Sequence, residues 1–392
     1  MMDGISRNAL LISFSAFFAD FGYQAVVAAL PILMVVILHA PPYVFGITVA
    51  VSSGFGAVLA YYGGALSDIF GRKRITILGN ILIPILSLSG IAANFYEAAA
   101  LFSGGWLSRN FRSPSRRALL NDEVNDSNRG KVFGLLNALD VGGGAFSIIL
   151  LISLSLLGVP LRYIILLTAI PILFSTVLLL LVREKRRRMP GRKAQLKRER
   201  IARVRGSMAY KGVIIATALY GFSFYSLGFP ILTIAQYSSS NVLGYLSYLI
   251  FLIGSALFGY FIGSRKIRLI KGLGILGYLM SAVATAAIGI AYAFHLSIYL
   301  MYAAVLFMGM AIGTIDTLEP SLVSIVKSGS KIGKGMGSLT ASRSVGIFIG
   351  NIAMGLLYGI SPAFSYAYAA IVSVVAASVI LVSGKGIWER RA

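Results

Sequence analysis

The chain has 392 residues, of which 57% are hydrophobic and only 12% charged, with a mean hydropathy of +0.84. Soluble domains carry about 25% charged residues, so this composition excludes a soluble globular protein and indicates a membrane protein. The absence of cysteine excludes disulfides, thiol catalysis and cysteine-ligated metals. A net charge of +22 would suggest a nucleic-acid partner in a soluble protein, but here its distribution along the chain indicates membrane topology instead.

Twelve apolar segments have the length of a membrane span, for which about 20 residues are needed. The residues from Met1 to Arg7 lead directly into the first segment, which is too long for the core of a signal peptide. We therefore interpret it as the first helix and predict an all-α membrane protein with two six-helix bundles. The predicted spans are 8–38, 44–66, 75–93, 97–119, 131–157, 161–182, 211–237, 241–263, 269–294, 298–326, 335–358 and 363–384.

The second and third spans are joined by the sequence Gly64-Ala-Leu-Ser-Asp68-Ile-Phe-Gly71-Arg72-Lys73-Arg74. Gly71 suits the tight turn, because glycine reaches positive φ at little steric cost. Arg72 and Lys73 stand where a cytoplasmic loop collects positive charge. One interpretation of this segment is an ordinary positively charged hairpin between two spans.

Nearly all of the 35 lysines and arginines fall on alternate breaks between the spans. By the positive-inside rule these breaks are cytoplasmic, and so are both termini. The sequence thus predicts a multi-pass protein of the inner (plasma) membrane with an even number of helices.

Residues 183–210 form the one long polar stretch, with Arg186-Arg187-Arg188 and only two acids. We interpret this stretch as a basic cytoplasmic linker that lies against anionic lipid head groups. A role in binding nucleic acid is the alternative, but no aromatic residues are interleaved with the basic ones.

An internal repeat divides the chain at this linker. Gly130-Lys-Val-Phe-Gly134 matches Gly333-Lys-Gly-Met-Gly337, so the fifth and eleventh spans correspond. The predicted domains are an N-terminal bundle, residues 1–182, and a C-terminal bundle, residues 211–392.

Ionisable residues inside hydrocarbon are costly, and those that remain mark candidate sites. At a rise of 1.5 Å per residue, Asp20 lies about 18 Å from the start of its span, near the midplane. Asp140 and Arg343 each lie nine residues beyond the repeated lysine, about 14 Å deep. The other candidates are Gln24, one turn after Asp20, then Arg109 and Arg112 on one face of the fourth span, and Asp316 and Glu319 on the tenth.

Structural interpretations stand beside these functional ones. Arg112 and Arg116 are alternatively cytoplasmic-end charges that pair with Asp68, Asp122 or Glu123. Asp140 and Arg109 are alternatively an ion pair inside the first bundle. Asp20 has no obvious partner on its own helix, which favours a functional role. Asp316 and Glu319 either share a proton, as a carrier needs, or are held by Arg343.

The loop from Gly64 to Arg74 resembles the loop between helices 2 and 3 of the major facilitator superfamily, G-x-L-x-D-x-x-G-R/K-R/K. Gly64, Leu66, Asp68, Gly71, Arg72 and Lys73 match it, and Ile69 replaces a usual basic residue. The resemblance implies two pseudo-symmetric bundles that handle substrate at mid-membrane by alternating access, with this loop as a cytoplasmic gating latch.

Three further blocks resemble a bacterial and archaeal permease subgroup whose members are commonly described as general permeases or drug exporters. They are Asp20 to Gln24 with Pro31, Arg109-Asn-Phe-Arg112-Ser-Pro-Ser-Arg116, and Arg129 to Gly134 continuing to Asp140. Gln24 replaces a glutamate of the first pattern. The Gly-Pro that antiporters often carry in helix 5 is replaced by Ser147-Ile148.

The leading hypothesis is a secondary active transporter, coupled to protons, that exports a small amphipathic organic compound. The alternative is a uniporter or importer of an organic carboxylate or phosphate, bound by the mid-membrane arginines. A divalent-metal exporter using Asp20 and Gln24 has little support, because the chain has only two histidines. The sequence shows no nucleophile–base arrangement and no phosphate-binding loop, so we expect neither an enzyme, a cofactor nor ATP-driven transport. Two homologous halves also fit a carrier better than a channel. We expect a monomer.

Overall fold

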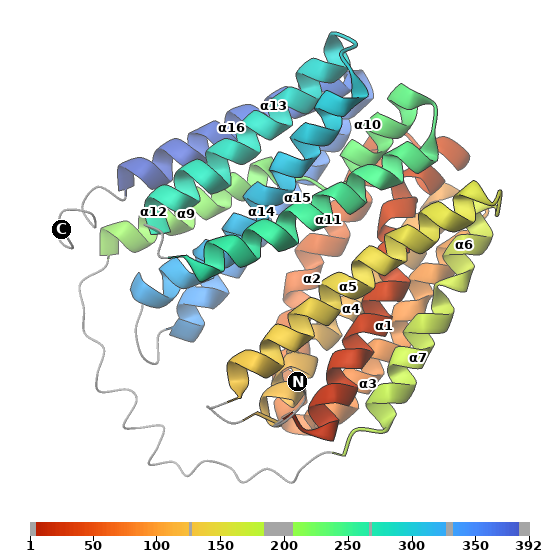
Figure 1. Ribbon diagram of the computed structural model, residues 1–392. Helices are drawn as coiled ribbons and strands as arrows, with labels where there is room; N and C mark the ends of the chain where they lie inside the picture. Colours follow the sequence, from red (N-terminus) through yellow and green to blue (C-terminus); the bar gives the residue numbers. More distant parts are fainter. Residues whose placement is uncertain (1–4, 125–127, 184–206, 266–268, 327–331, 384–392) are drawn as a thin grey trace. The chain divides into compact units, whose positions relative to one another are not determined.

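The computed structural model describes residues 5–124, 128–183, 207–265, 269–326 and 332–383 (Figure 1). Within these residues the secondary structure is helical throughout. The predicted basic linker lies almost entirely outside this range. Contacts divide the chain into two units, one of residues 1–185 with 227–252 and the other of residues 186–226 with 253–392.

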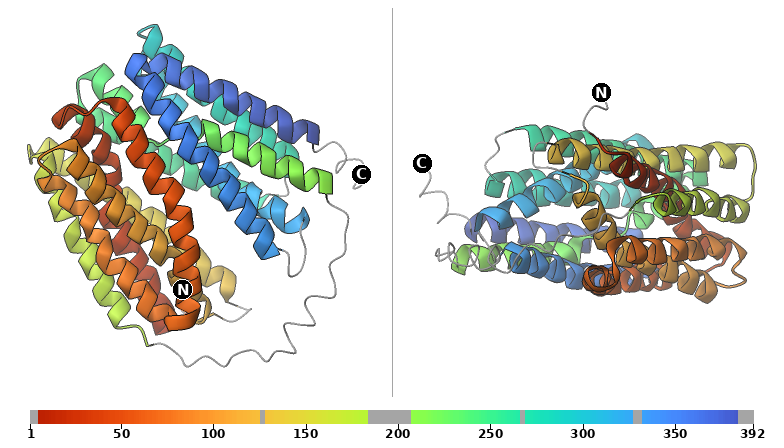
Figure 2. Two further views of the ribbon diagram at one scale, coloured as in Figure 1. Left: turned by 180° about the vertical axis from the view of Figure 1, so that it is seen from behind. Right: turned by 90° about the horizontal axis from the view of Figure 1, so that it is seen from below.

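The first unit contains the six predicted N-terminal spans, which lie side by side within it (Figure 2). Three of these spans are built from two segments each. The helices are α1 (Arg7–Pro31) with η1 (Ile32–Ile37), α2 (Pro42–Phe70), α3 (Arg72–Leu82) with η2 (Ile83–Ile91), α4 (Phe95–Asn121), α5 (Arg129–Leu156), and α6 (Leu161–Leu167) with α7 (Ala169–Leu180).

The second unit contains the C-terminal spans, apart from the stretch that packs with the first unit. That stretch is α10 (Gly228–Ser238) and the first half of α11 (Asn241–Ser264). The remaining helices are α9 (Ser207–Ser223), α12 (Leu269–Lys271) with η3 (Gly272–Leu279) and α13 (Met280–Ala293), α14 (Ile298–Val326), α15 (Ile332–Ile360) and α16 (Pro362–Ser383).

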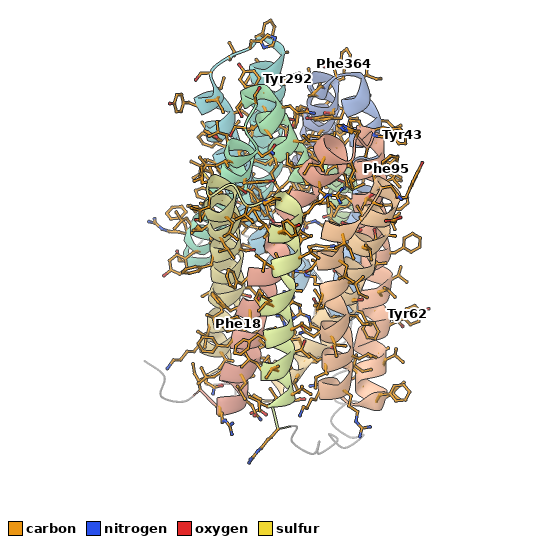
Figure 3. The ribbon with its side chains drawn as sticks, turned by 90° about the vertical axis from the view of Figure 1, so that its right-hand side faces the viewer. Phe18, Tyr43, Tyr62, Phe95, Tyr292 and Phe364 are labelled. Atoms are coloured by element: carbon orange, nitrogen blue, oxygen red, sulfur yellow. The ribbon has the colours of Figure 1, made fainter. Side chains whose placement is uncertain are left out.

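Within the described residues, eleven helical segments are long and apolar enough to cross a membrane. The helix α4 has 27 residues, which is sufficient length, but it carries Arg109, Arg112, Arg116 and Arg117. Large apolar side chains are exposed along α2, as a lipid-facing surface requires. Tyr62, for example, is 54% exposed and projects away from the helices (Figure 3).

Local sequence sets several helix ends. At the start of α4, the Asn94 side chain accepts a hydrogen bond from the Glu97 amide at 3.0 Å, and Glu97 accepts one from the Ala93 amide at 2.9 Å. This arrangement is a variant of the capping box, in which Glu97 accepts from the residue before the N-cap. Gly71 separates α2 from α3 at a φ of 97°, which confirms the predicted turn.

The predicted span 211–237 is not one continuous helix, because α9 ends at Ser223 and α10 begins at Gly228. Asn351 on α15 stabilises the break. Its side-chain oxygen accepts a hydrogen bond from the Ser226 amide at 2.8 Å, and its nitrogen donates to the Phe224 carbonyl at 3.4 Å. A side chain from a distant helix thus satisfies backbone groups that the helix leaves unpaired.

Candidate functional site

Asp20 is a buried carboxylate on α1, and only 4% of the residue is exposed. Its Oδ1 accepts a hydrogen bond from the Tyr23 hydroxyl and a longer one of 3.5 Å from the Gln24 amide. Its Oδ2 is buried and accepts no hydrogen bond from the described residues. The expectation that Asp20 lacks a partner on its own helix is therefore wrong, since Tyr23 lies at the i+3 position on the same face.

Arg109 on α4 lies between two aromatic rings. Its guanidinium carbon is 5.3 Å from the centroid of Tyr23 and 4.9 Å from that of Trp106, and the Nε donates to the Tyr23 hydroxyl at 3.3 Å. Cation–π contacts of this kind hold a cation while leaving its edges unused. The terminal nitrogens of Arg109 are not among the buried unpaired atoms, and the residue is half-buried.

Gln24 joins this cluster to a helix from the other half of the sequence. The hydroxyl of Tyr248, on the part of α11 that packs with the first unit, donates to the Gln24 Oε1 at 2.8 Å. Tyr248 is itself 6% exposed. The Asp20 cluster therefore draws side chains from α1, α4 and α11.

Arg112 is completely buried, and all three of its guanidinium nitrogens lack an acceptor among the described residues. It is therefore not a cytoplasmic-end charge paired with Asp68, Asp122 or Glu123, because its position on α4 carries it into the packed bundle. A Cβ added at Gly79 of α3 would lie 2.7 Å from the Arg112 Cβ, so α3 and α4 pack closely at this point. A small ligand cannot reach Arg112 in this arrangement.

Asp140 on α5 pairs with Arg116 and not with Arg109, the partner that the sequence suggested. The Nη2 of Arg116 lies 3.3 Å from each carboxylate oxygen of Asp140. Arg116 lies seven residues after Arg109, two turns nearer the cytoplasmic end expected for α4, and this register brings it to Asp140. The site prediction named Arg112, whereas the structure brings Arg116 into the charged cluster.

The second unit contains its own charged cluster. Arg343 on α15 lies 3.0 Å from Asp316 and 3.4 Å from Glu319, both on α14, so the predicted alternative in which Arg343 holds the two acids is confirmed. Glu319 is 1% exposed at the side chain, whereas Asp316 is 56% exposed. The two acids therefore have different environments although they share one cation.

Glu319 also receives neutral donors that the sequence did not indicate. The Tyr278 hydroxyl on η3 donates to its Oε1 at 2.6 Å, and Thr217 on α9 lies 3.5 Å from the same oxygen. Tyr278 stacks on Tyr220, with centroids 4.4 Å apart. The Arg343 guanidinium carbon is 5.2 Å from the ring centroid of Phe224. Both units thus combine a buried carboxylate, a tyrosine donor and an arginine against an aromatic ring.

The predicted gating loop lies where α2 passes into α3. Arg72 contacts Asp68 at 3.7 Å, forms a second ion pair with Asp122, and donates to the Ala118 carbonyl at 2.7 Å. Lys73 donates to the Leu180 carbonyl at 2.9 Å. The loop therefore binds the ends of α4 and α7 within the first unit, through backbone carbonyls near the last turn of each helix. A Cβ on Gly64 would meet Pro114 at 3.6 Å, which is an ordinary contact.

The site residues that the sequence analysis did not name fall into two groups, one with a local sequence signal and one without. Tyr23 lies three residues after Asp20, and Trp106 lies three residues before Arg109, so helical spacing was sufficient to find them. Tyr248, Tyr278 and Thr217 come from other helices, and no local pattern marks them. Among the described residues, no three His, Cys, Asp or Glu side chains are grouped as metal ligands.

A polytopic helical protein with a buried charged cluster in each unit has the architecture of a membrane transporter. The sequence profile of the Major Facilitator Superfamily matches residues 12–325. The chain therefore belongs to this superfamily, in agreement with the resemblance of the loop between its second and third spans.

Known proteins support the same assignment. The uncharacterized MFS-type transporter YqjV of Bacillus subtilis (strain 168) is 30% identical over 128 residues, and the match spans 31% of each chain. A POT family transporter in complex with a thioalcohol conjugated peptide aligns with a TM-score of 0.80 at 14% identity over 98% of both chains. A D-xylose-proton symporter aligns with a TM-score of 0.75 at 16% identity, over 95% of this chain and 96% of the other. At such identities the structural likeness establishes the fold alone.

Proposed function

We propose that this protein is a proton-coupled secondary active transporter that exports a small amphipathic organic compound by alternating access. The observation that supports the proposal best is a pair of buried carboxylates, Asp20 and Glu319, on membrane-spanning helices. Each accepts a hydrogen bond from a tyrosine, and each unit places an arginine in the same cluster. Ionisable groups at such depth usually serve transport or proton transfer.

In this mechanism, a proton that binds Asp20 or Glu319 removes one negative charge from a cluster that also contains arginines. The balance of charge inside the unit then changes, and so does the relative energy of the conformations open to either side. Arg109 and Arg343 act as counter-charges or as anchors for anionic groups. The loop with Gly64, Asp68, Gly71, Arg72 and Lys73 is proposed to latch the cytoplasmic side. The D-xylose-proton symporter with the same fold is a precedent for proton coupling.

We further propose that the protein works as a monomer in the plasma membrane, with both termini cytoplasmic and residues 183–210 on anionic lipid. The repeated halves remain residues 1–182 and 211–392 in this proposal. Basic residues on alternate breaks support the orientation. No enzymatic or nucleic-acid-binding role is part of the proposal.

Proton coupling is tested with purified protein in liposomes and a ligand found by thermal-shift screening of diverse amphipathic compounds. We expect an imposed pH gradient to drive ligand movement by the native protein. Asp20→Asn should lose the ligand movement that the pH gradient drives. It should still fold normally, because asparagine accepts the Tyr23 hydrogen bond. Glu97→Gln, an acid-to-amide change at the exposed end of α4, is the matched control and should retain gradient-driven ligand movement. Native transport that ignores the gradient contradicts the proposal.

One observation favours a second function, the uptake or uniport of an organic anion. The terminal nitrogens of Arg109 hydrogen-bond to no described residue, although the ring contacts hold the guanidinium in place. A planar guanidinium with a free edge binds carboxylate or phosphate well. Arg112, which the sequence grouped with Arg109 for this role, is sealed inside the bundle and does not support it.

The two functions differ in their response to Arg109→Gln. If the substrate is an anion held by Arg109, ligand binding should weaken by about tenfold or more, as loss of a charged hydrogen bond predicts. Asp20→Asn should then leave binding nearly unchanged. Isothermal titration of the screened ligand against both variants measures this. Unaltered affinity in Arg109→Gln rules out the anion anchor.

A further inference from the structure

The helices that carry the charged residues have equivalent positions in the two halves of the chain. The repeated Gly-Lys motif sets an offset of 203 residues, and α4 with α14 and α5 with α15 begin at the same offset. A Cβ added at Gly79 would lie 2.7 Å from Arg112 on α4. A Cβ added at Gly277 would lie 2.8 Å from Ile315, the equivalent residue of α14. Positions on these helices can therefore be compared between the two units.

Each unit has an ion pair at the same two positions, with the charges exchanged. In the first unit, Arg116 on α4 lies 3.3 Å from Asp140 on α5. In the second unit, the residues 203 positions later are Glu319 on α14 and Arg343 on α15, which lie 3.4 Å apart. The side chains on α4 and α14 are 5% and 1% exposed, and their partners on α5 and α15 are 23% and 21% exposed. The two pairs thus match in position, distance and burial, and differ only in which helix carries the acid.

The property common to both pairs is attraction between neighbouring helices. Arginine does not lose its proton in proteins, so Arg116 cannot carry protons. A buried charge on one helix and an opposite charge on the next fix the register of the helices, because displacement would leave a charge buried and unpaired. Glu319 occupies the position of Arg116, and this equivalence favours the same role for it.

The cluster around Asp20 has no charged counterpart in the second half. The sequence Pro-Ile-Leu begins in α1 and recurs in α10, and the two copies are 199 residues apart. By this offset Asp20 corresponds to Leu219. Arg109 on α4 corresponds to Ile312 on α14, 203 residues later. Apolar residues therefore stand in the second repeat where the first has an acid and an arginine.

The oxygens of Glu319 are both occupied by donors. Its Oε2 pairs with Arg343, and its Oε1 accepts a hydrogen bond of 2.6 Å from the Tyr278 hydroxyl. A cation and a neutral donor suit an ionised carboxylate, because such a group is an acceptor only. A proton that binds Glu319 has to displace one of these donors.

Asp20, in contrast, forms no ion pair with a described residue. It meets Arg109 of α4 only through the Tyr23 hydroxyl, and Asp140 of α5 is paired with Arg116. Its Oδ2 is buried without a donor among the described residues. A proton can therefore bind at Oδ2 without displacing a described donor.

We propose that the two ion pairs are one interhelical clamp, present in each repeat with its charges exchanged, and that Asp20 is the carboxylate that carries the coupled proton. The proton comes from water on one side of the membrane and forms an O–H bond at Oδ2. It leaves to the other side when that bond breaks, and no other bond changes. Glu319 remains ionised and holds α14 to α15. The assignment to Asp20 rests on the proposed proton coupling, whereas the clamp does not.

Exchange of the charges tests the clamp by thermal melting. Glu319→Arg alone places two arginines together and should lower the melting temperature by about 5 °C or more. Addition of Arg343→Asp reproduces the order of the first unit and should recover at least half of this loss. Arg116→Glu, with and without Asp140→Arg, is the matching test in the first unit. Where a single variant does not fold, folding of its double variant is the recovery. Two exchanged pairs that recover nothing overturn the clamp.

The liposome assay tests the assignment of the proton, with the amphipathic compound selected by the thermal-shift screen as the probe. The quantity compared is the ratio of probe movement with and without the pH gradient, for equal amounts of folded protein. Asp20→Asn should abolish this response. Glu319→Arg with Arg343→Asp should move the probe more slowly but retain most of the response, although residue 319 then carries no carboxylate. Glu319→Gln with Arg343→Gln takes its place if the exchanged pair does not fold.

The outcomes separate the two parts of the inference. A folded variant without a carboxylate at residue 319 that loses the response overturns the assignment to Asp20, and so does a response that survives in Asp20→Asn. Native protein without any response contradicts the proposed proton coupling itself. The melting temperatures of the exchanged pairs decide the clamp in either case.

Discussion

Replacing Arg343 with glutamine is expected to destabilise the protein by about 3 kcal/mol, because removing one partner strands a buried charge. The stranded group is Glu319, whose side chain is 1% exposed and 3.4 Å from Arg343. Asp316 should contribute little, since it is 56% exposed and water can replace the lost cation. Thermal unfolding in detergent, followed by circular dichroism, measures the change.

The double variant Arg343→Gln with Glu319→Gln tests whether the stranded charge of Glu319 causes the loss of stability. Two neutral amides leave no unpaired buried charge, so the double variant should recover much of the stability lost in the single one. Arg265→Gln is the matched control, because Arg265 is exposed and stacks on Phe261 only at the surface, with 4.9 Å to the ring centroid. If the double variant is as unstable as Arg343→Gln alone, the broken ion pair between Arg343 and Glu319 is not the cause of the lost stability.

Replacing Gly346 with alanine is expected to cost about 2 kcal/mol or more, because the helices α9 and α15 approach too closely to admit a methyl group. An added Cβ would lie 2.4 Å from the Ala218 carbonyl oxygen and 2.7 Å from the Gly221 Cα. These are backbone atoms, so only separation of the helices relieves the clash. Because Arg343 lies one turn earlier on α15, its contact with Glu319 should weaken as well.

The same helix supplies the control for this prediction. Gly359 is exposed, and a Cβ there would meet nothing within 4 Å. Gly359→Ala should therefore raise stability by about 0.5 kcal/mol through helix propensity alone. Melting temperatures of the two variants should move in opposite directions. Equal effects at both positions would refute close packing at Gly346 as the cause.

Features of the fold were predicted correctly from the sequence where they depend on residues close together in the chain. Hydropathy located the spans because the energy of burying a segment in lipid depends on composition over about 20 residues. The loop around Gly71 was recognised because its turn depends on one residue type. The break between Ser223 and Gly228 was missed, because Asn351, more than a hundred residues away, supplies the hydrogen bonds that stabilise it.

The sequence by itself determined the class of protein and the superfamily, and it marked Asp20 and Glu319 as charged residues inside predicted spans, since each of these follows from composition, hydropathy or a short motif. Only the tertiary structure decided how those charges pair. It joined Asp140 to Arg116 rather than Arg109, sealed Arg112 without a partner among the described residues, and brought Tyr278 to Glu319. Such pairings depend on the rotation and register of neighbouring helices, which side-chain packing between distant segments fixes, so a residue's depth in its own helix does not reveal its partner.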